Sequence, residues 1–162
     1  MKRCRKALCI AISIVNLGNF ELAAQAKYMP DKENSMTPRE KVLDNLIEKG
    51  DYKTAEVAVR LGGANPNALN PIDQMTLFVK AFEKALIAHE DNPGLIVHID
   101  PARAQIAIAL AKAGGNIRNV ERDAGHFLDT SGRPNMEHFA NNEVAKDFLT
   151  FLQSLRAAAL NR

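Results

Sequence analysis

The sequence predicts an all-α protein, built as a short stack of about three helix-turn-helix units with an inserted loop in the second unit. Apolar residues recur at helical spacing in several segments, and pairs of glycines end two of these segments. No segment shows the sustained alternation of apolar and polar residues that predicts a strand beyond short turns. The chain has 162 residues, 46% of them apolar and 25% charged, which fits one folded domain.

Residues 1–26 are expected to form a signal peptide that is removed from the mature protein. Four basic residues lie within 2–6, an apolar run follows at 7–17, and Ala24-Gln25-Ala26 provides the small residues of a cleavage site. The apolar run is shorter than the roughly 20 residues that a membrane-spanning helix needs. Lys27 stands where a lipoprotein would have cysteine, so we expect no anchor after cleavage. The alternative is an amphipathic N-terminal helix of a cytoplasmic protein.

Removal of this leader changes the net charge and takes away both thiols. The chain has 21 basic and 19 acidic residues, and the leader contains four of the former and one of the latter, which leaves a formal charge of −1 on 27–162. Attraction to nucleic acid or to an anionic membrane therefore has no electrostatic support. Because Cys4 and Cys9 both lie in the leader, the mature chain has no disulfide, thiolate nucleophile or cysteine-ligated metal.

A polar, turn-rich segment at 27–36 is expected to link the leader to a folded domain at 37–162. The domain opens with a strong helix start, in which Thr37 is the N-cap, Pro38 the first helical residue and Glu40 the partner in a capping box. The apolar stripe that follows consists of Val42, Leu43, Leu46 and Ile47 and ends at Gly50. This pattern predicts the first helix of the domain.

Four more helices are predicted from apolar periodicity and glycine stops. The second helix, at 52–61, and the fourth, which begins at Asp100-Pro101, both end at a pair of glycines. The third spans 76–88 and is strongly apolar. The last, at 142–158, has a wide apolar face that suits a helix covering the rest of the domain.

Two segments that close apolar helices carry a repeated pattern. They read Gly63-Ala64-Asn65-Pro66-Asn67-Ala68 and Gly114-Gly115-Asn116-Ile117-Arg118-Asn119, and a leucine follows 14 residues after the first glycine in each, at Leu77 and Leu128. The pattern resembles the ankyrin repeat, whose units end in Gly-Ala-Asp-x-Asn, turn through a hairpin tip and re-enter a helix at Thr-Pro-Leu-His. Met75-Thr76-Leu77-Phe78 and His126-Phe127-Leu128-Asp129 stand at the re-entry position and keep only the leucine.

The spacing of these segments departs from a regular array. Gly63 and Gly114 lie 51 residues apart, whereas ankyrin units repeat every 33 or so residues, which indicates roughly 18 extra residues in the second unit. We place this insertion between the two helices of that unit, within 87–101. The alternatives are a tetratricopeptide-like array and an irregular helical bundle.

The resemblance implies that the protein recognises another protein on an extended concave surface. The family's variable contact positions, carried over by register, fall on polar residues, on a proline, on a glycine and on two large apolar side chains, Ile72 and Phe82, which would serve as anchors. The set consists of Glu40, Glu48, Lys49, Pro71, Ile72, Gln74, Phe82, Glu83, Arg122, Asp123 and Gly125. Phe82 could instead pack in the core, and each charged residue could belong to a solvated face.

No pattern in the sequence predicts catalysis, a cofactor or a metal. The four histidines, His89, His98, His126 and His138, lack the helical spacing of a metal site, and the motifs of serine hydrolases, phosphate-binding loops and dinucleotide folds are absent. We therefore expect a monomeric, non-enzymatic, periplasmic or secreted protein that acts as an inhibitor, immunity protein or scaffold. The alternatives are a host-directed effector that keeps its N-terminus and a small hydrolase whose site lies in the inserted segment.

Overall fold

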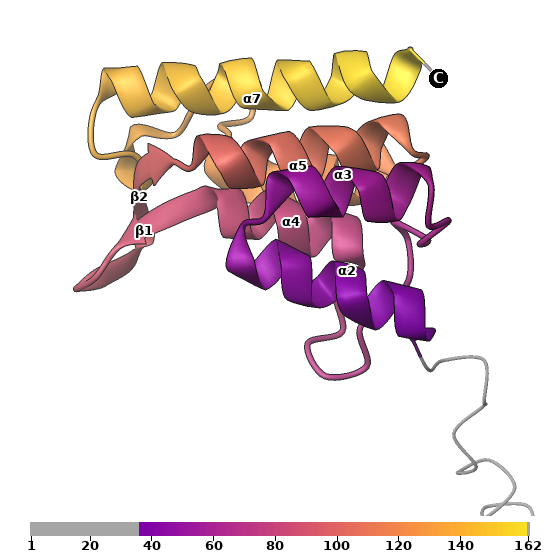
Figure 1. The fold of residues 1–162 in the computed structure, drawn as a ribbon. Helices are drawn as coiled ribbons and strands as arrows, with labels where there is room; N and C mark the ends of the chain where they lie inside the picture. Colours follow the sequence, from indigo (N-terminus) through magenta and orange to yellow (C-terminus); the bar gives the residue numbers. More distant parts are fainter. Residues whose placement is uncertain (1–35, 162) are drawn as a thin grey trace, which may run out of the picture. The chain divides into compact units, whose positions relative to one another are not determined.

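The computed structural model describes residues 36–161, which are mostly helical (Figure 1). The prediction of a helical protein is confirmed in this coarse sense, although the described part also contains a two-stranded antiparallel sheet. The predicted signal peptide and almost all of the predicted linker lie outside the described residues. The elements are α2 (Pro38–Lys49), α3 (Tyr52–Arg60), α4 (Leu77–Ala85), β1 (Leu86–His89), β2 (Asn92–Ile99), α5 (Pro101–Lys112), α6 (Ile117–Ala124), two short 3-10 helices (Gly125–Phe127 and Met136–His138) and α7 (Asn142–Leu160).

The helix boundaries follow from local signals that the sequence contains. At the start of α2, the Glu40 N–H donates to the Thr37 hydroxyl at 3.4 Å, and the Thr37 N–H donates to the Glu40 carboxylate at 2.7 Å. These two bonds form the predicted capping box. The helix ends where Gly50 adopts a φ of 71°, a left-handed conformation that glycine tolerates. At the start of α5, the Asp100 carboxylate accepts the N–H groups of Ala102 and Arg103.

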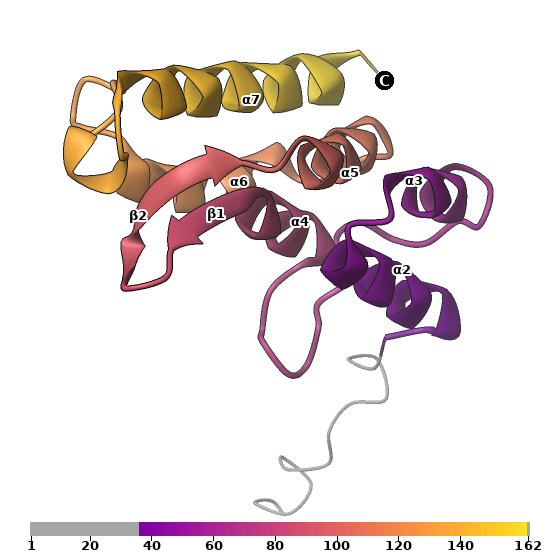
Figure 2. The same ribbon diagram turned by 60° about the vertical axis from the view of Figure 1, so that its left-hand side comes forward.

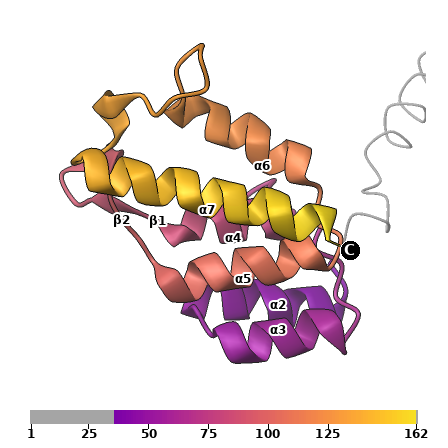
Figure 3. The same ribbon diagram turned by 90° about the horizontal axis from the view of Figure 1, so that it is seen from above.

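The helices form two rows. In the first row α2 packs against α4 and α4 against α6, while in the second row α3 packs against α5 and α5 against α7. Contacts of α2 with α3, of α4 with α5 and of α6 with α7 join the rows. Figure 2 shows α7 along the upper edge of the helices, and Figure 3 shows it from above, with α6 on one side of it and α5 on the other.

The two segments with the repeated glycine pattern lie against each other. The Asn67 side-chain amide donates to the Gly114 carbonyl at 2.9 Å, and the Asn116 N–H donates to the Asn67 side-chain oxygen at 2.7 Å. Gly115 is held close to the first row, because a Cβ on it would lie 2.5 Å from the Phe78 ring. Asn67 of the first motif therefore fastens the loop before α4 to the loop before α6.

The core contains a cluster of phenylalanine rings between the rows. Phe82 of α4 is fully buried and stacks on Phe151 of α7 at a centroid distance of 5.8 Å. Phe148 lies 6.3 Å from Phe82 and 5.1 Å from Phe139, so the cluster continues toward the segment that precedes α7. The wide apolar face predicted for the last helix is buried here.

The segment predicted as an inserted loop contains a β-hairpin, so the prediction that it has no strands was wrong. Leu86 pairs with Ile99 and Ala88 with Ile96, with irregular register between these pairs. The strands escaped prediction because only Ile96 is deeply buried, which leaves no sustained alternation. The third predicted helix also ends early, at Ala85 instead of residue 88, because the chain turns extended at Leu86.

Helix α6 begins earlier in the chain than the helix re-entry predicted at Leu128. Helix α6 starts at Ile117, directly after Asn116, whose side chain accepts the Arg118 N–H. The predicted re-entry at Leu128 is wrong, since this residue lies in a loop and bridges to Pro134. The true helical signal was the spacing of Val120 and Ala124, which are buried on one face of α6.

Candidate functional site

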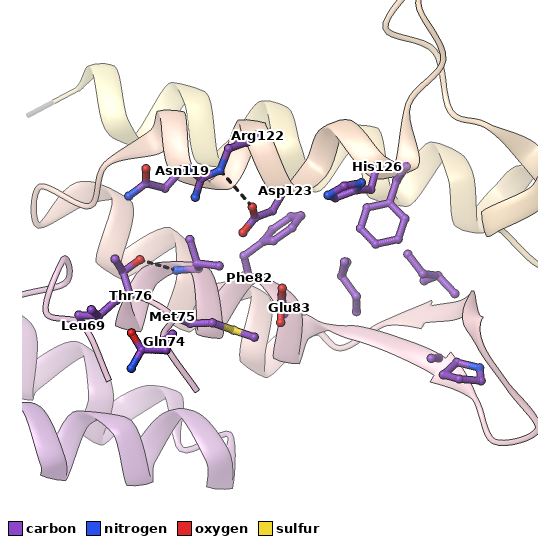
Figure 4. A pocket seen from close by; sticks show the side chains of 16 residues that line it. Leu69, Gln74, Met75, Thr76, Phe82, Glu83, Asn119, Arg122, Asp123 and His126 are labelled. Atoms are coloured by element: carbon purple, nitrogen blue, oxygen red, sulfur yellow. Dashed lines mark hydrogen bonds and ion pairs between the residues drawn. The ribbon is translucent and has the colours of Figure 1, made fainter. Parts of the chain in front are cut away.

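A groove of about 690 Å³ lies beside α4 and α6. The loop at 69–76 borders it on one side and the β-hairpin on another, and Phe127 follows α6 along its wall. Figure 4 shows labelled side chains from the loop, from α4 and from α6 gathered around it. Its lining is more apolar than polar, which is typical of recognition sites with a few placed polar groups.

Several residues predicted as partner contacts line this groove. They come from three separate segments of the sequence and are Gln74, Phe82, Glu83, Arg122 and Asp123. The remaining predicted residues lie outside it, on α2, at the tip of the 69–76 loop and after α6; they are Glu40, Glu48, Lys49, Pro71, Ile72 and Gly125. The structure therefore brings together five positions that the ankyrin register predicts in the second and third units.

Phe82 does not provide an exposed anchor, and that part of the prediction was wrong. Its side chain is fully buried and lies beneath the groove, where it packs on Phe148 and Phe151. Its apolar neighbours account for a large aromatic side chain at this position without any partner protein. The core interpretation, which the sequence had left open, is the one observed.

Ile72 stands at the tip of a compact loop and is 91% exposed. Leu69 and Thr76 bridge the base of this loop, and the Asn70 N–H donates to the Met75 carbonyl at 2.8 Å. The Asn70 side chain accepts the Ile72 N–H at 2.9 Å. Figures 1 and 2 show the loop projecting from the molecule on the side away from α7. The loop thus holds a large apolar side chain out in solvent, where it contributes little to folding.

Gln74 gives this loop its shape. It has a φ of 60°, a left-handed conformation that is uncommon for a residue with a side chain. Its side-chain amide donates to the Pro71 carbonyl at 2.8 Å, which ties the two sides of the tip together. This backbone conformation destabilises the folded state by about 1 kcal/mol, and it occurs in the loop that presents Ile72.

A buried lysine, which sequence reasoning missed, joins this loop to the helices. The Lys80 ammonium of α4 lies 2.6 Å from Asp44, 3.0 Å from Glu48 and 3.2 Å from Asp73. Burial alone would lower the pKa of Lys80, but hydrogen bonds to these three carboxylates outweigh it and raise the pKa above its usual value. Asp73 belongs to the loop and the other two to α2, so one cation fastens three segments. The only sequence signal was a lysine within the apolar run of α4.

Glu48, a predicted contact residue, is already engaged. Its carboxylate lies 2.8 Å from the Lys84 ammonium as well as near Lys80, and hydrogen bonds to these two lysines lower its pKa. Glu40 has its place in the capping box of α2. Lys49 is exposed in the last turn of α2, and a side chain at Gly125 would meet nothing within 4 Å, so both positions border open solvent.

Glu83 and Asp123 are the carboxylates of the groove. Burial raises the pKa of Glu83, and the nearby charges of Asp123 and Asp73 raise it further, against a smaller lowering by the charge of Lys84. The Glu83 side chain is exposed to water on one side and lines the groove on the other. Within residues 36–161 no ion pair or hydrogen bond is found for the Glu83 side chain. Asp123 has a long contact of 3.6 Å with Arg122, whose side chain is 75% exposed.

The histidines are dispersed over the described part of the chain. His138 lies edge-on to the Phe127 ring, and its Nδ1 is 3.3 Å from the Gly94 carbonyl. Residues 36–161 contain no group of three or more histidine, cysteine, aspartate or glutamate side chains arranged to hold a metal. In the same range, no helix combines the length and the apolar character needed to cross a membrane.

Comparison of the chain with family models, with curated proteins and with solved structures found no match.

Proposed function

We propose that the described domain is a degenerate ankyrin-like stack of three helix pairs that binds another protein on the surface of its first row. In this assignment α2 with α3, α4 with α5 and α6 with α7 are the units. The succession of contacts along each row supports the assignment, as does the hydrogen-bonded pairing of the two glycine-motif loops. The loop at 69–76 would be the hairpin tip between the first two units, and the β-hairpin an insertion within the second.

The observation that carries the binding function is the exposed Ile72 beside a groove of about 690 Å³. A large apolar side chain that a hydrogen-bonded loop holds in solvent can serve as an anchor in a protein interface. The groove next to it has the volume of a recognition pocket. A protein that touched Ile72 could extend along α4 and α6 into the groove.

We further propose that the mature protein begins at Lys27 and acts outside the cytoplasm, in the periplasm or after secretion. The basic n-region, the apolar run and the small residues before Lys27 support this. An exported binding module would serve as an inhibitor, an immunity protein or a scaffold for an envelope or secreted protein.

The test is a pull-down from the envelope fraction with three versions of the purified protein: wild type, Ile72→Asp and Leu160→Asp. Leu160 is the matched control, because it is 84% exposed but lies at the end of α7. We expect a protein that wild type and the control retain and that Ile72→Asp loses. Equal retention by all three versions, or retention by none, would contradict the proposal.

A further inference from the structure

We propose that the groove receives a lysine or arginine side chain from an otherwise apolar segment of the partner protein, held between Glu83 and Asp123. This inference rests on the proposed function and specifies the partner's chemistry. Glu83 belongs to α4 and Asp123 to α6, and both line the groove, as Figure 4 shows. A cation between them would contact two elements at once.

The charge balance of the first row favours a cation at this place. Asp44, Glu48 and Asp73 already share the Lys80 ammonium, and Glu48 also has Lys84. Within the described residues Glu83 has no ion pair or hydrogen bond and senses only the charge of the neighbouring Lys84, and Asp123 has only the long contact with an exposed arginine. Five carboxylates thus face three cations along this surface, and the two that line the groove are the most weakly paired of the five. Their mutual repulsion would be relieved by one positive charge.

The walls of the groove suit the remainder of such a segment. Met75, Leu86, Ile96 and Phe127 supply apolar surface around the two carboxylates. The aliphatic stem of a lysine or arginine can lie along apolar side chains while its charged end meets a carboxylate. Once bound, the apolar residues of the segment would exclude water from the ion pair, so the pair would be less screened than one on an open surface.

The experiment uses a phage-displayed library of random linear peptides, selected on the purified protein. We expect the enriched peptides to carry one lysine or arginine flanked by apolar residues. A selected peptide is then resynthesised with norleucine in place of its basic residue. We expect norleucine to weaken binding by about tenfold, which corresponds to about 1.4 kcal/mol.

The protein side is tested with the double variant Glu83→Gln/Asp123→Asn. Its matched control is Glu137→Gln/Asp147→Asn, which changes the net charge equally at two exposed positions outside the groove. The groove itself is filled by Ala88→Arg, with Ala157→Arg on the exposed face of α7 as control. We expect the Glu83/Asp123 double variant to weaken the basic peptide at least tenfold and to leave the norleucine peptide unchanged.

Three outcomes would overturn the inference, and they separate it from the proposed function. Enriched peptides without a basic residue, whose binding Ala88→Arg abolishes, would show that the groove binds protein segments but selects no cation. A basic peptide that the Glu83/Asp123 variant binds as tightly as wild type would have the same meaning. Peptides unaffected by every groove substitution would refute both the inference and the groove as the binding surface.

Discussion

Replacing Lys80 by methionine removes one cation from beneath three carboxylates and should destabilise the protein markedly. Methionine keeps the length and the helix propensity of lysine, so the change leaves little cavity and isolates the charge. The Lys80 side chain is 8% exposed, whereas Asp44, Asp73 and Glu48 are 22%, 28% and 43% exposed. Breaking a fully buried ion pair costs about 3–5 kcal/mol, but these carboxylates can regain water. We therefore expect a loss of about 2–3 kcal/mol of unfolding free energy.

The assay is urea unfolding of the purified protein followed by far-UV circular dichroism, with Lys84→Met as the control. Lys84 lies one turn further along α4, and its ammonium contacts Glu48 at 2.8 Å, but the pair is exposed. Such a surface pair contributes at most about 1 kcal/mol. Adding Asp73→Asn to Lys80→Met should restore part of the loss, because it removes one of the repelling charges. A Lys80→Met protein within about 0.5 kcal/mol of the Lys84→Met control would refute the reasoning.

Acid pH provides an independent check on this cluster. The folded state lowers the pKa of Glu48, so this group stabilises the protein above the ordinary glutamate pKa and loses that contribution as the pH falls through its folded value. The stability difference between wild type and Lys80→Met should therefore shrink as the solution is acidified. A difference that stays constant through this range would show that the loss does not come from the carboxylates.

Three other predictions follow from the structure. Glu83→Gln should raise the free energy of unfolding at neutral pH, because folding raises the pKa of Glu83 and so disfavours its charged form. The gain should be less than about 1 kcal/mol, since water screens the exposed carboxyl. In urea titrations below the ordinary glutamate pKa the gain should vanish. Gly115→Ala should cost about 1–3 kcal/mol in the same assay, because its Cβ would meet the Phe78 ring at 2.5 Å and the Leu110 carbonyl at 2.9 Å; an unchanged midpoint would mean that the loop yields freely. The intact mass of the native protein should correspond to a chain that begins at Lys27, and a full-length cytoplasmic species would instead favour an intracellular or host-directed role.

The parts of the fold that could be predicted from the sequence are those fixed by local chemistry. Thr37 and Glu40 cap α2, and Asp100 with Pro101 starts α5, because caps depend on residues within one turn of the chain. The last helix was predictable for a related reason, since its apolar periodicity is long. The hairpin at 86–99 was not, because its pairing joins short strands with one deeply buried side chain.

The site depended on contacts that local patterns do not encode. The register argument placed Glu83 and Asp123 on the binding surface, but their meeting in one groove needs α6 to begin at Ile117, which the spacing argument missed. The role of Lys80 could not be predicted either, because its three carboxylate partners lie on α2 and in the 69–76 loop, and only the packing of these segments brings them together. Phe82 was predicted on the surface but lies in the core, because on a helix as apolar as α4 the sequence does not distinguish a buried aromatic position from an exposed one.

The most direct test of the central claim is site-specific photo-cross-linking in the cells that make the protein. A photoreactive phenylalanine derivative replaces Ile72 at the tip of the loop and, in a second strain, Leu160 at the end of α7; both positions are exposed. The account predicts a discrete adduct with one other protein from position 72 and none from position 160. No adduct from position 72, or the same adduct from both positions, would contradict a binding surface on the first row of helices.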